Sequence, residues 1–182
     1  MGGGSRCVST IEQVTGELSA LSTGVERAQG QAGAAEAQAQ EVARRAAAAG
    51  FSAVAAGMGR VQAAIGDVRG GLGALSGVVG QVAQAAAGVP QQASPQETIA
   101  GLTPVQSGID GIRDAAGAVI AQVGQAQQLV AMVLQGGQPG PLLQALDAVK
   151  QVVAQVAQQS GGVRQSVDTV IAQASQLGAS GN

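Results

Sequence analysis

The feature that most constrains this chain is an apolar stripe at alternating three- and four-residue spacing. One stripe runs through residues 11–49 and a second through residues 51–89, and no stripe position in either carries a charge. The spacing averages about 3.5 residues, as in coiled coils. Each stripe therefore predicts a long helix packed along its length against other helices.

Two further stripes, at residues 105–133 and 142–177, predict two more helices. Apolar residues beside these stripes widen the face to be buried: Ile120, Leu129, Leu134, Val152 and Ile171. A wider stripe covers more than one neighbour. We therefore expect an all-α fold of four long helices in two coiled-coil-like antiparallel hairpins, and the wider face favours a four-helix bundle. The sequence leaves open whether the hairpins close on each other or on a second chain.

Capping signals set the expected boundaries of the first hairpin, residues 9–89. Ser9 and Glu12 fit a capping box, which predicts a helix start near Thr10 after a disordered extension at 1–8. Gly50 is expected to end this helix in a left-handed conformation, with Phe51 in the turn. Residues 90–103 are expected to form a linker after the second helix.

The second hairpin is expected at residues 104–177. Ser94, Pro95 and Glu97 form a capping signal that predicts a short helix at about 95–101 within the linker. Thr103-Pro104 is expected to open the third helix in the same way. Ser160-Gly161-Gly162 predicts a kink or a local fray in the fourth. Residues 178–182 are expected to form a disordered tail.

Folding the first hairpin at Gly50 brings together residues whose numbers sum to 100. Ala28 then meets Leu72, Ala32 meets Val68 and Leu21 meets Val79. Small residues oppose large ones in the half near the turn. The flanking positions are mostly polar or small, which predicts a narrow seam.

The second helix also carries glycines on the side opposite its apolar stripe. These are Gly59, Gly66, Gly70, Gly73, Gly77 and Gly80. Glycine inside a helix costs about 1 kcal/mol relative to alanine, and aligned small residues let another helix backbone approach closely. We expect this candidate interaction face to contact the third or fourth helix, or another copy of the protein. The alternative is that glycine is abundant in this chain and the face is solvated.

The composition gives no catalytic, cofactor or metal site. The chain has no His, which excludes Ser-His-Asp and Cys-His arrangements and histidine metal ligands. The single cysteine, Cys7, has no base nearby in sequence. Net charge is −2 without a basic block, so nucleic acid is not an expected partner. We expect a non-enzymatic protein without cofactors.

No secretory signal is recognised, so the protein is expected to be cytoplasmic as synthesised. Export by a non-classical route with a partner is left open. The uncharged runs at 70–96 and 115–146 are broken by Gln and by Gly-Pro, so membrane contact is not favoured.

Residues 9–89, folded at Ala49-Gly50-Phe51-Ser52, resemble the small Trp-x-Gly hairpin family associated with type VII secretion. Those proteins pair into four-helix dimers and serve as secreted factors or as partners of larger effectors. The Trp-x-Gly turn is absent here, and without Tyr the chain lacks the Tyr-x-x-x-Asp/Glu export signal, so a partner would have to carry it. The whole chain is also similar to Ala/Gly-rich helical proteins of unknown function common in actinobacteria.

The leading hypothesis is a helical interaction protein that self-associates or escorts a secreted helical partner. The alternative is a structural or surface-coating protein, phasin-like or a filament subunit. A helical pore-forming component is the third hypothesis.

Overall fold

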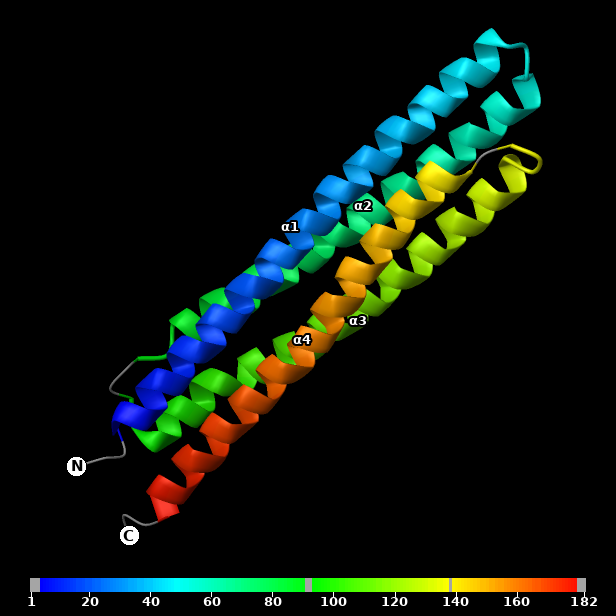
Figure 1. Ribbon diagram of the computed structural model, residues 1–182. Coiled ribbons are helices and arrows are strands. Elements are labelled where there is room, and N and C mark those ends of the chain that lie inside the picture. The colour runs from blue at the N-terminus through cyan, green and yellow to red at the C-terminus, as the bar shows by residue number, and fades with distance from the viewer. Residues whose placement is uncertain (1–3, 91–92, 138, 180–182) are drawn as a thin grey trace.

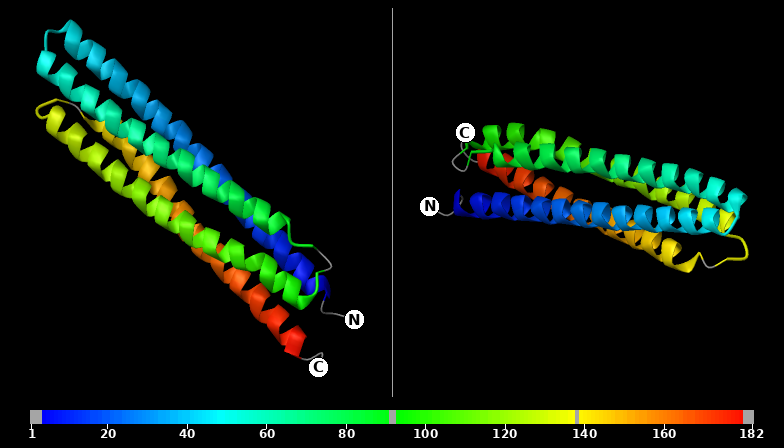
Figure 2. Two further views of the ribbon diagram at one scale, coloured as in Figure 1. Left: turned by 180° about the vertical axis from the view of Figure 1, so that it is seen from behind. Right: turned by 90° about the horizontal axis from the view of Figure 1, so that it is seen from above.

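The protein is an antiparallel four-helix bundle (Figure 1). The computed structural model describes the backbone of residues 4–90, 93–137 and 139–179, and the side chains from Ile11 onward within these ranges. The helices are α1 (Gly4–Ala48), α2 (Ser52–Ala87), α3 (Pro95–Val133) and α4 (Gly140–Ala179). Each packs against two neighbours: α1 against α2 and α4, and α3 against α2 and α4. The two hairpins therefore close on each other within one chain (Figure 2).

Glycines end the first helix of each hairpin. Gly50 has φ 81° and Gly136 has φ 84°, a left-handed conformation that costs glycine little. At the first turn, Phe51 N–H donates to the Ala46 carbonyl at 2.8 Å and Gly50 N–H to that of Ala47 at 3.1 Å. This is a Schellman motif, which satisfies the last carbonyls of α1. The expected cap at Gly50 is confirmed.

Helix α1 begins earlier than expected, at Gly4 rather than near Thr10. Residues 4–8 are helical, so the expected disordered extension at 1–8 was wrong over that part, and residues 1–3 lie outside the described residues. No proline interrupts this segment, and extending an existing helix is far easier than nucleating one. At the other end, Gly178 and Ala179 belong to α4, and residues 180–182 of the expected tail lie outside the description.

The capping signal at Ser94 is confirmed, but it starts the whole of α3. Ser94 Oγ accepts from Glu97 N–H, and the Glu97 carboxylate accepts from Ser94 N–H at 2.8 Å. The expected short helix at 95–101 and the new start at Pro104 were wrong, since Pro104 lies inside one continuous helix. The stripe continues through Thr98 and Leu102, which are buried. Their burial stabilises the helical turns that precede the proline. Pro104 itself is exposed, so water can solvate the carbonyl it leaves unbonded.

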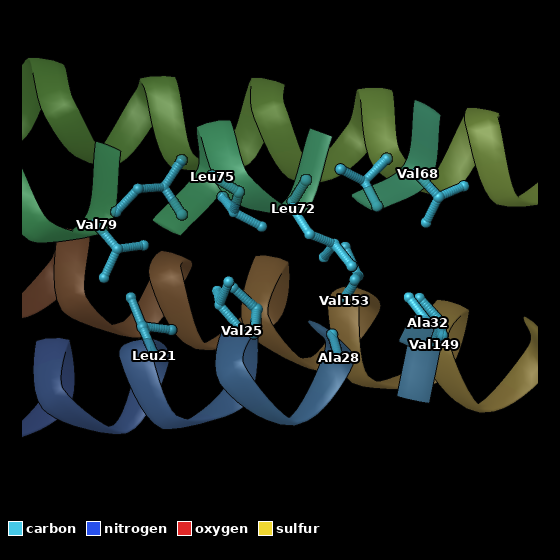
Figure 3. Packing of buried hydrophobic residues seen from close by; sticks show 14 of the residues in the cluster. Leu21, Val25, Ala28, Ala32, Val68, Leu72, Leu75, Val79, Val149 and Val153 are labelled. Carbon is cyan, nitrogen blue, oxygen red and sulfur yellow. The ribbon is translucent and has the colours of Figure 1, made fainter. Parts of the chain in front are cut away.

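The four stripes form one core that runs the length of the bundle. The expected register of the first hairpin is visible in Figure 3, where facing residues lie at the same level: Leu21 and Val79, Val25 and Leu75, Ala28 and Leu72, Ala32 and Val68. Val153 and Val149 of α4 lie at the levels of Ala28 and Ala32. The small α1 residues Ala28 and Ala32 are fully buried, so their size is matched by larger side chains opposite.

Helix α4 continues without interruption through Ser160-Gly161-Gly162, so the expected fray is absent from this part of the helix. Ser160 is fully buried in the stripe and its hydroxyl donates to the Ala157 carbonyl at 2.7 Å. A buried hydroxyl satisfied by its own helix needs no break in that helix.

The hairpins dock through glycines that face valines. A Cβ built on Gly57 of α2 would lie 2.7 Å from Val133 of α3, and one on Gly24 of α1 would lie 2.8 Å from Val156 of α4. A Cβ on Gly71 would meet both Gln122 and Val119 of α3. On α3 itself, Gly108 meets Val82 of α2, and Gly101 meets Val89, which follows the end of α2. All of these contacts join one hairpin to the other. The absent side chains let the hairpins approach closely.

Candidate functional site

The six glycines of the candidate interaction face lie on the outer surface of α2. All six are exposed, and a Cβ built on any of them would meet no atom within 4 Å. The expectation that this face contacts α3 or α4 was wrong. The reason is geometric, since the buried stripe of α2 and both its flanks are already used by α1 and α3. Contact with another copy remains a prediction.

Five other glycines, which the sequence pattern did not single out, receive a neighbouring helix: Gly24, Gly57, Gly71, Gly101 and Gly108. Each directly precedes a buried stripe residue, as Gly57 precedes Met58 and Gly108 precedes Ile109. That position lies on the flank of the stripe, where a square bundle places its second neighbour. Position relative to the stripe was only a partial signal, because Gly162 also precedes a buried stripe residue, Val163, and has open space above it.

Charges flank only the first half of the glycine face. Arg60, Asp67 and Arg69 are exposed on α2, and residues 70–96 carry no charge. Arg69 is turned toward α1, where it pairs with Glu36. From Gly70 to Gly80 the outer surface of α2 therefore presents backbone, alanine and neutral polar groups, which impose no charge requirement on whatever approaches it.

The turn residues singled out in the sequence lie together at one end of the bundle. Gly50 is exposed in the turn, and Phe51 directly follows it with 64% of its surface exposed. Phe51 sits at the start of α2 without a side-chain capping hydrogen bond. The aromatic ring therefore does not serve the core of this hairpin.

Charged side chains join α3 to α4 on the side of the bundle across from the α1–α2 pair. Arg164 contacts Asp110 at 2.5 Å and Asp168 at 3.3 Å, and Gln106 donates to Asp168 at 2.5 Å. The hydrogen bond to Asp110 is the main cause that raises the pKa of Arg164 above its ordinary value. Exposed ion pairs of this kind contribute at most about 1 kcal/mol.

Open grooves lie along the helix boundaries. One of about 340 Å³ lies between α1 and α4, beside Gly24 and Arg27. Another of about 650 Å³ lies between α3 and α4, beside Asp110, Arg113 and Asp114. Across the described ranges, no group of three or more His, Cys, Asp or Glu side chains is arranged to hold a metal ion. Within those same ranges, no helix is both long and apolar enough to cross a membrane.

The fold and surface define a closed, antiparallel four-helix bundle with one glycine-lined outer helix. Residues 93–179 match a family described as a family of unknown function (DUF6244). The matched segment contains the second hairpin, α3 and α4, while α1 and α2 lie outside it. No curated protein matches the chain, and no solved structure does.

Proposed function

We propose that this protein is a non-enzymatic assembly protein whose α2 glycine face (Gly59, Gly66, Gly70, Gly73, Gly77 and Gly80) receives a helix of a second copy. The observation that carries the proposal is a contrast between two sets of glycines. Five glycines on the flanks of the stripes (Gly24, Gly57, Gly71, Gly101 and Gly108) are covered by side chains of the other hairpin, whereas the six on the face have open space.

The energetic cost of the face supports the proposal. Six glycines in the interior of one helix cost about 1 kcal/mol each relative to alanine. Within the single chain this cost has no return, because no side chain fills the space above them. Close approach of another backbone would offset it through van der Waals contact along the whole stripe.

An escort role for a type VII-type secreted protein would use the same face for a different occupant, a helix of that partner. In the Trp-x-Gly family that the first hairpin resembles, a second hairpin completes a four-helix dimer. In this chain α3 and α4 take that position. A helical partner would therefore have to dock on an outer surface, for which the glycine face is the best candidate. The surface-coating alternative receives less support, because the apolar stripes are buried in the core.

Sedimentation of the full chain over a range of concentrations tests self-association. We expect the wild type to form a discrete oligomer. The triple variant Gly66→Leu, Gly73→Leu, Gly80→Leu should be monomeric, because leucine side chains would hold two backbones apart. The matched control is Gly16→Leu with Gly30→Leu on α1, where the space is also open. The control should assemble like the wild type.

Cysteine trapping locates the interface. In a Cys7→Ser background, Gly73→Cys should form a disulfide between copies when the glycine faces of two copies pair with each other, and Gly30→Cys should not. A wild type that stays monomeric at every concentration would overturn the proposal, as would a triple variant that assembles normally. Circular dichroism should show equal helix content in all variants, since the substituted positions are exposed.

A further inference from the structure

The first hairpin projects beyond the second at the end that carries both turns. Gly57 of α2 lies against Val133, the last residue of α3. The first five residues of α2 and the turn before them therefore extend past α3, by about 8 Å at the helical rise per residue. Figure 1 shows the α1–α2 turn reaching farther than the turn between α3 and α4. Residues 47–53, which we call the tip, are all exposed.

The tip is apolar and carries no charge. No charged residue occurs at 46–59 or at 115–146, so both turns and the helix ends around them are neutral. Phe51 is 64% exposed at the tip and Met132 is 58% exposed near it, at the end of α3. Two of the three large exposed hydrophobic side chains of the described residues are thus at this end of the bundle.

Arginines are the first cations below the tip on both helices of the hairpin. The nearest charged residues on α1 are Arg44, Arg45 and Glu41, and the nearest on α2 is Arg60. Glu41 pairs with both Arg44 and Arg45, so three guanidinium groups are balanced by one carboxylate. These four side chains, which we call the collar, carry a net charge of about +2.

We propose that the tip docks on an anionic lipid surface, where Phe51 enters the interfacial layer and Arg44, Arg45 and Arg60 contact lipid phosphates. An apolar projection of about 8 Å matches the depth to which interfacial segments enter a bilayer. One guanidinium group can donate two parallel hydrogen bonds to the oxygens of a phosphate. Each arginine near an anionic membrane surface contributes about 1 kcal/mol of attraction. A second copy fits this end poorly, because a tip-to-tip contact would bring two positive collars together.

Co-sedimentation of the full chain with phosphatidylcholine vesicles, with and without phosphatidylglycerol, tests this proposal. We expect binding only where phosphatidylglycerol is present, weakened by added salt. Phe51→Ser should weaken it about tenfold, through loss of apolar burial. Changing Arg44, Arg45 and Arg60 together to Gln should weaken it about a hundredfold.

The matched controls are Leu177→Ser, an exposed apolar residue at the far end, and Arg113→Gln, an exposed cation on α3. Both should bind like the wild type. The proposal is overturned by absence of vesicle binding, which would favour an acidic protein as the partner of the tip, or by equal binding to neutral vesicles. It is also overturned if Phe51→Ser binds normally, since the arginines would then act without the tip. The glycine-face triple variant should bind vesicles normally, so the two proposals can fail separately.

Discussion

Gly108 of α3 lies so close to Val82 of α2 that a Cβ on the glycine would overlap a valine methyl group. The same relationship recurs between Gly71 and Val119, with the glycine on the other helix. Glycine and valine thus exchange sides along the α2–α3 boundary. Valine side chains occupy the space left beside the glycines, and this fit fixes the distance between the two hairpins.

Gly108→Ala should therefore destabilise the bundle. Overpacking costs about 1–3 kcal/mol, and it is offset in part by the better helix propensity of alanine, about 1 kcal/mol. Denaturant unfolding followed by circular dichroism measures the net effect. Gly111→Ala is the control, because its Cβ would lie 3.6 Å from Val78, an ordinary contact, and it should be neutral or stabilising. Adding Val82→Ala should relieve the Gly108→Ala clash. Equal free energies of unfolding for Gly108→Ala and Gly111→Ala would contradict the overpacking explanation.

The seam between α1 and α2 makes a separate prediction about size. Ala28 and Leu72 are fully buried and face each other (Figure 3). Leu72→Ala should cost about 2–5 kcal/mol, because Ala28 cannot fill the space. Ala28→Leu alone should cost about 1–3 kcal/mol by overpacking.

The double variant with the two residues exchanged tests whether the pair acts as a unit. It should recover part of the combined loss, as measured by a double-mutant cycle of unfolding free energies. Strict additivity would mean that α3 and α4 side chains, rather than the facing residue, determine the space around each position.

The register of this seam could be predicted because two local features determine it. The 3–4 spacing defines which residues point inward, and the left-handed Gly50 fixes where the chain reverses. The use of the remaining faces could not be predicted in the same way. Whether Gly71 or Gly73 receives a neighbour depends on which flank of the stripe the second hairpin covers, a tertiary relationship that neither helix encodes alone.

At Pro104 a local sequence signal was overridden by tertiary packing. This proline resembles a helix start, yet buried Leu102 and Val105 on either side keep α3 continuous. Proline in a helix interior costs about 3 kcal/mol. Pro104→Ala should therefore raise the free energy of unfolding, by about 1–3 kcal/mol after the greater freedom of the unfolded chain is counted. Pro95→Ala is the control, because proline is well tolerated at a first turn, and it should change stability little.

The capping box at the start of α3 gives a pH dependence whose sign is fixed. Hydrogen bonds from the backbone and then the hydroxyl of Ser94 lower the pKa of Glu97 below its usual value. A carboxylate with a lowered folded-state pKa stabilises the fold above its unfolded-state pKa, and this contribution is lost as pH falls through the folded-state value. Glu97→Ala should thus lower the melting temperature at neutral pH and have little effect at a pH below both values.

Two companion variants separate charge from hydrogen bonding in this cap. Glu97→Gln keeps a side-chain acceptor for the Ser94 N–H, so it should retain part of the cap without the pH dependence. Ser94→Ala removes the acceptor for Glu97 N–H and should cost about 1 kcal/mol. Melting curves of the wild type and the three variants across acidic and neutral pH provide the measurement. If the gap between the wild type and Glu97→Ala stays constant on acidification, the carboxylate charge has no part in capping α3.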